Sequence, residues 1–191
     1  MKSSKLLKLI IFALLGTISV VLMFLNFPLP FLPSYLKIDF SDVPALLAGL
    51  LFTPVAGIIV EGVKNSLYLV LTGAHDPVGV VGNFFAGTLF VLPVAVLYHR
   101  LKGPKSLVSG LITGTIVMAL GMGVLNYFVL LPAYSLFMGM EEMAIPTVKW
   151  ATVIAGITPF NLIKGTIVGL LFIPLFAKLR PWLERKRASL V

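Results

Sequence analysis

The sequence lacks cysteine, has only two histidines and contains few charged residues. Without cysteine there is no disulfide, no thiolate metal ligand and no cysteine nucleophile, and two histidines alone do not build a histidine-rich metal site. Charged residues are 12% and hydrophobic residues 59% of the 191 positions, against about 25% and 45–50% in soluble domains. This balance excludes a soluble globular protein, whose surface needs polar cover, and it excludes a disordered chain.

The sequence contains long runs of apolar residues in which charged residues are rare. A membrane-spanning helix needs about 20 apolar residues, and we expect helices over 6–27, 43–52, 55–72, 78–99, 106–131 and 150–179. The second of these is about half the required length. The first run has a basic start, but it is longer than a signal-peptide core and lacks a good cleavage site, so we expect a retained helix. The sequence therefore predicts an all-α integral membrane protein, a six-helix transmembrane bundle without a separate soluble domain.

The segment after the first helix is predicted to be a structured loop. Three prolines between positions 28 and 33 exclude a helix there. Residues 36–40 then alternate between apolar and charged side chains, which is the period of a strand. Asp42 is expected to be the N-cap of the next helix, with Pro44 in its first turn.

The distribution of charge predicts the orientation in the membrane. Eleven of the 15 lysines and arginines lie in the N-terminal flank, the 100–105 loop and the C-terminal tail. Five of the seven acids lie in the segments 28–42, 73–77 and 132–149. By the positive-inside rule both termini are cytoplasmic and these three acidic segments are external. The net charge of +8 then indicates contact with anionic lipid rather than with nucleic acid.

Away from their ends, the predicted helices contain three charged residues, and each charge inside a membrane needs a reason. Glu61 and Lys64 are three positions apart on one helical face, so they can form a structural ion pair or lie near an interface. Lys164 has no charged partner nearby in the sequence. An unpaired lysine at that depth favours a cavity or a ligand over lipid.

Asparagines occur on four predicted helices, at Asn65, Asn83, Asn126 and Asn161. Each could simply form a hydrogen bond between helices. The last three, however, lie in the outer halves of their helices, which favours a polar pocket open to the outside. Asparagine offers donors and an acceptor without charge, so a neutral ligand fits better than a phosphate, which would call for arginine.

Small residues and missing motifs complete the pattern. Helix–helix contacts, or docking to a partner protein, are indicated by small side chains at Ala13, Gly16, Thr17, Ser106, Gly110, Gly114, Gly165 and Gly169. There is no HExxH, GxSxG or Walker A motif. We therefore expect that the chain is not an enzyme and does not itself hydrolyse ATP.

Several segments of the sequence are distinctive when taken together, and they lie at residues 27–33, 36–44, 57–65, 76–79, 83–84, 125–128 and 159–165. They include Asp-Phe-Ser-Asp at 39–42, Leu-Asn-Tyr-Phe at 125–128 and Pro-Phe-Asn-Leu-Ile-Lys-Gly at 159–165. With these segments the chain resembles, over nearly its whole length, the riboflavin-specific substrate-binding subunits (S components) of bacterial energy-coupling-factor (ECF) vitamin importers. The Asp-Phe-Ser-Asp segment is similar to a feature of several vitamin S components, whereas the other two segments are more specific to the flavin branch.

The resemblance implies an external riboflavin pocket roofed by the first loop, with riboflavin as transported ligand and no cofactor. Residues 1–191 would then form a single transmembrane substrate-binding domain in the bacterial plasma membrane. It also implies partners, namely one scaffold membrane protein and two cytoplasmic ATPase subunits. Small residues of the first helix would meet the scaffold, at Ala13, Gly16 and Thr17, although a strict Ala-x-x-x-Ala pair is not present there.

Riboflavin has a flat apolar ring with a polar imide edge and a neutral hydroxylated chain, so its pocket needs apolar walls and a few polar groups. The walls are expected from Leu36, Ile38, Phe40 and Tyr127. Contacts to the imide edge are expected from Asn126 and Lys164, and contacts to the ribityl hydroxyls from Asn83, Asn161 and Asp39. The alternatives are an S component for another small neutral vitamin and a small membrane-embedded enzyme.

Overall fold

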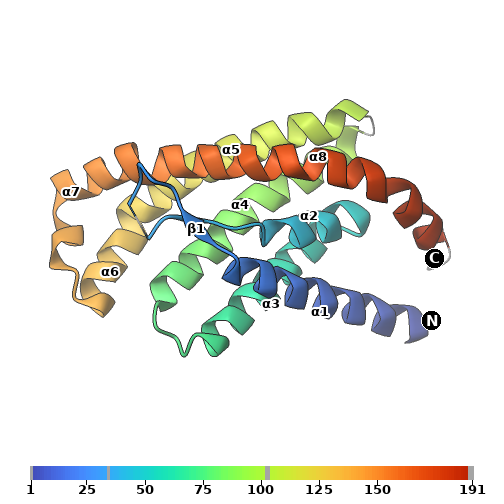
Figure 1. Cartoon of the computed structure of the whole chain (residues 1–191), viewed down its shortest axis with the longest axis horizontal. Helices are drawn as coiled ribbons and strands as arrows, with labels where there is room; N and C mark the ends of the chain where they lie inside the picture. The colour runs from blue at the N-terminus through green and yellow to red at the C-terminus, as the bar shows by residue number, and fades with distance from the viewer. Residues whose placement is uncertain (1, 34, 102–103, 189–191) are drawn as a thin grey trace.

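The structure is a computed structural model that describes residues 2–33, 35–101 and 104–188 (Figure 1). The first half contains four helices, α1 (Lys2–Phe24), α2 (Asp42–Leu51), α3 (Pro54–Leu71) and α4 (Pro77–Leu101). Between α1 and α2 lies a two-stranded antiparallel sheet of β1 (Phe27–Pro28) and β2 (Lys37–Ile38).

The second half consists of two long helical rods, each interrupted by a π-helical turn. The first rod is α5 (Pro104–Leu125), η1 (Asn126–Leu130) and α6 (Leu131–Met138). A 3-10 turn, η2 (Glu141–Ala144), follows. The second rod is α7 (Pro146–Ala151), η3 (Thr152–Ile157) and α8 (Thr158–Ala188).

The six predicted helices are confirmed as six rods, of which five are long and apolar enough to cross a membrane while α2 is shorter. The sequence predicted a connection over 132–149 between the last two helices, and both boundaries of this connection are wrong. The fifth rod continues through Pro132 to Met138, and the sixth begins at Pro146. Pro132 falls in the first turn of α6, directly after η1.

The predicted extended loop is confirmed in part. Phe27 pairs with Ile38 and Pro28 with Lys37, so the strand is shorter than the alternation over 36–40 suggested. The prediction that Asp42 is an N-cap is wrong. Ser41 holds that position without a side-chain cap bond, and Asp42 is the first residue of α2.

The bundle has two opposite ends, and the chain termini and the connecting segments lie at different ones (Figure 1). The start of α1 and the end of α8 lie together at one end, whereas α6, α7 and the turn between α3 and α4 lie toward the other. Helix α2 begins near the middle of the bundle and runs toward the end that holds the start of α1. Asp42, the first residue of α2, is buried.

Helices α4 and α5 cross closely at the centre of the core. A Cβ atom on Gly114 would lie 2.7 Å from the main-chain oxygen of Phe90, and one on Gly110 would lie 3.1 Å from that of Val94. Phe90 and Val94 are themselves fully buried. The small residues predicted to mark helix packing on the fifth helix thus do so.

Candidate binding site

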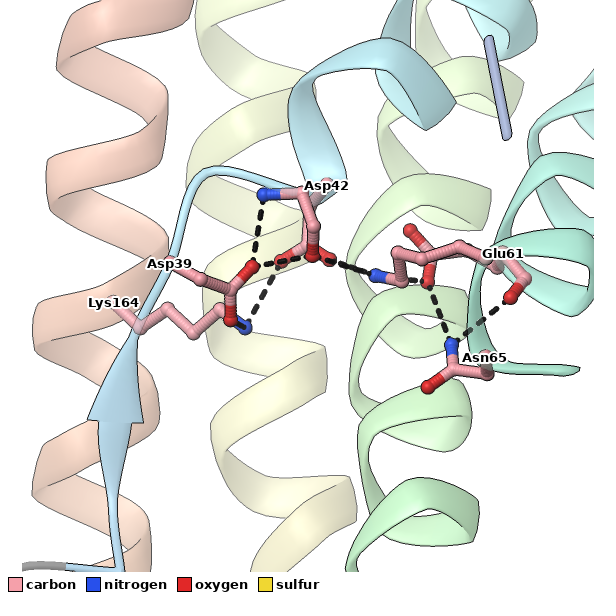
Figure 2. Close-up of polar contacts among 7 residues, drawn as sticks. Asp39, Asp42, Glu61, Asn65 and Lys164 are labelled. Atoms are coloured by element: carbon pink, nitrogen blue, oxygen red, sulfur yellow. Dashed lines mark hydrogen bonds and ion pairs between the residues drawn. The ribbon is translucent and has the colours of Figure 1, made fainter. Parts of the chain in front are cut away.

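Polar side chains gather in the interior where the first loop meets α2, α3 and α8 (Figure 2). None of them is more than 4% exposed. We call this group the polar cluster, and it consists of Asp39, Ser41, Asp42, Glu61, Lys64, Asn65 and Lys164.

Lys64 of α3 is at the centre of the cluster. Its Nζ lies 2.6 Å from Glu61 Oε2 and 2.8 Å from Asp42 Oδ1, and it donates to Ser41 Oγ at 3.0 Å. The Glu61–Lys64 pair expected from their spacing is confirmed. Asn65 donates to the main-chain oxygen of Glu61 at 2.9 Å, and it is the last residue of the cluster on α3.

Lys164 approaches from α8 on the opposite side (Figure 2). Its Nζ lies 3.2 Å from Asp39 Oδ2 and 3.3 Å from Asp42 Oδ2. The expectation that Lys164 is unpaired is therefore wrong. Its partner Asp39 is 125 residues away in the chain, so no local spacing could have indicated the pair.

Asp39 also organises the turn into α2. Its Oδ1 accepts hydrogen bonds from the main-chain N–H of Ser41, at 2.8 Å, and from the Ser41 hydroxyl. With Oδ2 on Lys164, both oxygens of Asp39 are engaged. The first loop is thus tied to α8 by Asp39 and to α3 by Ser41.

Asn126 and Asn161 are buried next to the two π-helical turns. Asn126 is the first residue of η1 and donates to the Met122 main-chain oxygen at 2.8 Å. Asn161 donates to the main-chain oxygen of Ile157, the last residue of η3, at the same distance. Turns of this kind inside α-helices occur frequently at functional sites.

Sequence reasoning did not predict the π-helical turns, although one signal was available. Pro132 and Pro159 each lie two residues beyond the end of a π-helical turn, inside an apolar run that otherwise reads as continuous helix. A proline within such a run requires a local change in the hydrogen-bond ladder.

The expected wall residues fall into two groups. Ile38 is fully buried, and Phe40 packs near the Phe27 ring. Leu36 approaches Gly156, so the loop lies against η3. Tyr127 packs on Trp150 with ring centroids 4.8 Å apart. Trp150 was not among the predicted site residues.

Asn83 is not one of the residues of the polar cluster. It sits on α4, and its side-chain oxygen is buried with no hydrogen-bond partner among the described residues. A buried acceptor without a donor is costly, at about 1–3 kcal/mol. Asn83 therefore has an unmet requirement for a donor.

The outer face of α8 carries a shallow hollow of about 240 Å³. Leu162, Ile163, Thr166 and Ile167 line it. Asn161 and Lys164 are buried on a different face of the same helix. The hollow is therefore not the site that the polar residues build.

The three small residues of α1 do not share one environment. Gly16 is buried, and a Cβ atom there would collide with the Val63 side chain of α3. Ala13 and Thr17 are exposed, and the Thr17 hydroxyl donates to the Ala13 main-chain oxygen at 2.9 Å. Gly16 thus serves packing within the bundle, and only Ala13 and Thr17 remain for a docking surface.

A family model described as "ECF transporter, substrate-specific component" matches residues 7–176. The chain belongs to this family. Among relatives of this ECF component, the riboflavin transporter FmnP of Bacillus subtilis (strain 168) is 48% identical over 184 residues, covering 95% of this chain and 96% of the relative. The riboflavin transporter RibU of Staphylococcus aureus (strain TCH60) is 48% identical over 179 residues, covering 93% of each.

A solved structure supports the same assignment. The protein described as "Structure and mechanism of the S component of a bacterial ECF transporter" matches with a TM-score of 0.80 and 45% identity. The match covers 94% of this chain and 98% of that one. The resemblance inferred from the sequence, and the six-helix fold that it implied for an ECF substrate-specific component, are confirmed.

Proposed function

We propose that this ECF substrate-specific component binds riboflavin at the outer face of the bacterial plasma membrane and presents it for ATP-driven uptake by partner subunits. The observation that carries the proposal is the 48% identity, over nearly the full length, to two proteins named riboflavin transporters. The geometry agrees with it, because the first loop is anchored to Lys164 and the amides of Asn126 and Asn161 are also buried.

The polar residues can form further hydrogen bonds to a neutral ligand. An ammonium has three donors. Lys164 donates one hydrogen bond, to Asp39, and is ion-paired with Asp42, so it can still donate to a carbonyl of the flavin imide edge. Asn126 contributes to the same edge. Asn83, Asn161 and Asp39 contact ribityl hydroxyls, and a hydroxyl would supply the donor that Asn83 lacks.

The walls of the pocket come from the loop and from the outer part of the long rods. Leu36, Ile38 and Phe40 of the loop cover the ligand. The Tyr127 ring stacks on the flavin ring. An aromatic ring suits this place, since stacking adds about 0.5–1.5 kcal/mol beyond the burial of area.

The chain is a binding subunit rather than an enzyme, and residues 1–191 act as one substrate-binding domain in the lipid bilayer. Transport requires a scaffold membrane protein and two cytoplasmic ATPases. Ala13 and Thr17 form the face of α1 that meets the scaffold, which their exposure on a membrane-length helix supports.

The purified chain is expected to bind riboflavin in the absence of ATP, with one site per chain. Calorimetric titration in detergent tests this, and co-purification of a yellow chromophore with flavin absorption bands is a rapid first check. Other small neutral vitamins are titrated in parallel. Binding of one of these instead of riboflavin would contradict the substrate assignment. ATP hydrolysis by the pure chain would contradict the proposal that partner subunits hydrolyse ATP.

Both termini are expected to be cytoplasmic, which the charge asymmetry and the common location of the start of α1 and the end of α8 support. Because the chain has no cysteine, single cysteines at Ser3 and Glu141 can be labelled without background. On whole cells an impermeant maleimide is expected to label position 141 only. Labelling of position 3 from outside would refute this orientation.

A further inference from the structure

Lys64 has no place among the residues expected to touch the ligand, yet it is completely buried. Burying an ammonium is costly unless it is paired and hydrogen-bonded. All three of its contacts are within the polar cluster, at Ser41, Asp42 and Glu61. Two of these contacts belong to the junction between the first loop and α2, and the third belongs to α3.

The two lysines share the Asp42 carboxylate. Lys64 binds Oδ1 and Lys164 binds Oδ2, so the two ammonium groups hold this carboxylate from opposite sides. Ser41 makes a second link, because its hydroxyl donates to Asp39 and accepts from Lys64. Both carboxylates that orient Lys164 are therefore themselves connected to Lys64.

We propose that Lys64 is a positioning residue for the flavin site, acting through Ser41 and Asp42 without contacting the ligand. The inference rests on the proposed function. Lys64 ties the roof formed by the first loop to α3, and through Asp42 it fixes the direction in which Lys164 points. Because the loop is the roof of the proposed site, weakening this tie is expected to raise the dissociation rate more than it changes association.

The competing explanation is that Lys64 only braces the core. A bracing residue changes how much protein is folded and at what temperature it unfolds. It does not change the dissociation rate of ligand from the folded fraction. That rate is measured by preloading the full chain with radiolabelled riboflavin and chasing with excess unlabelled riboflavin.

Ser41→Ala is the mildest test, since it removes the hydroxyl link while the Ser41 N–H still bonds Asp39. We expect the dissociation rate to rise about 10-fold, the value of one lost buried hydrogen bond. Ser19→Ala is the matched control. Ser19 is equally buried, but it lies on α1 and its hydroxyl has no hydrogen-bond partner among the described residues. The Ser19 variant is expected to release riboflavin at the wild-type rate.

The double variant Lys64→Met/Glu61→Gln tests the lysine itself. It removes one positive and one negative charge, so the net charge of the cluster stays the same and no lone buried charge is created. We expect dissociation to accelerate at least as much as in Ser41→Ala. Ligand-free melting of each sample shows how much of it is folded.

The outcomes separate the inference from the function on which it rests. Wild-type protein that binds no riboflavin overturns the proposed function. Wild-type protein that binds riboflavin, together with wild-type dissociation rates in the folded fractions of both Ser41→Ala and Lys64→Met/Glu61→Gln, overturns the positioning role of Lys64.

Discussion

Lys164→Ala is expected to lower both the riboflavin affinity and the stability of the ligand-free protein. The affinity falls because the flavin loses a buried partner, at about 1–3 kcal/mol, or roughly 5- to 150-fold. The stability falls because the Asp39 carboxylate loses its cationic partner and that of Asp42 loses one of two. Removing one member of a buried ion pair costs about 3–5 kcal/mol. Calorimetric titration and ligand-free melting on the same sample measure the two effects.

Asn126→Ala is the comparison for Lys164→Ala. Asn126 is uncharged and donates to the main-chain oxygen of Met122, so its loss is expected to cost only about 1 kcal/mol of stability. The affinity is expected to fall by a similar 5- to 150-fold. Unchanged affinity in the folded fraction of either variant, with a lowered melting temperature, would remove that residue from the binding site.

A third variant covers the case in which Lys164→Ala does not accumulate. Lys164→Met/Asp39→Asn removes the ammonium and one of its two carboxylate partners together, so Asp42 retains Lys64 as a partner. This variant is expected to be more stable than Lys164→Ala. Its riboflavin affinity is expected to be at least as low, because both side chains belong to the proposed site.

Gly114→Ala is expected to destabilise the bundle by about 1–3 kcal/mol, the usual cost of overpacking a core. The added Cβ would lie 2.7 Å from both the Phe90 main-chain oxygen and a Val94 methyl carbon. A main-chain oxygen cannot move aside as a flexible side chain does. Helices α4 and α5 must therefore separate locally, which thermal melting in detergent would detect.

Gly169→Ala is the matched control for Gly114→Ala. It places the same methyl group in a membrane-length helix, but the nearest atoms are those of Leu111 at 3.8 Å, an ordinary van der Waals distance. Without a clash, the better helix propensity of alanine leaves stability unchanged or raises it by about 0.5–1 kcal/mol. Equal melting temperatures for the two variants would contradict the close crossing of α4 and α5.

The riboflavin affinity of Gly114→Ala adds a second comparison. The crossing point lies in the core, and neither Phe90 nor Val94 is among the expected ligand contacts. Folded Gly114→Ala protein is therefore expected to bind riboflavin with near wild-type affinity, unlike the folded fraction of Lys164→Ala.

Composition and the lengths of the apolar runs were sufficient to predict the class of protein, the number of helices and the position of the first loop. These features follow from local quantities, namely the length of each apolar run and the positions of prolines 28, 30 and 33. The Glu61–Lys64 pair was predictable for the same reason, because residues three apart lie on one helical face. The segments that resemble the family, among them those at 39–42, 125–128 and 159–165, were readable in the sequence as well.

The pairing of the polar groups, by contrast, became clear only from the folded arrangement of the helices. Lys164 meets Asp39 across 125 residues, and Asp42 serves two lysines instead of capping α2. Gly16 packs on Val63 because α1 lies against α3, although its neighbours Ala13 and Thr17 are exposed. Such contacts depend on how helices from distant parts of the chain come together. A one-dimensional pattern records which face a residue occupies, but it does not record which element lies opposite that face.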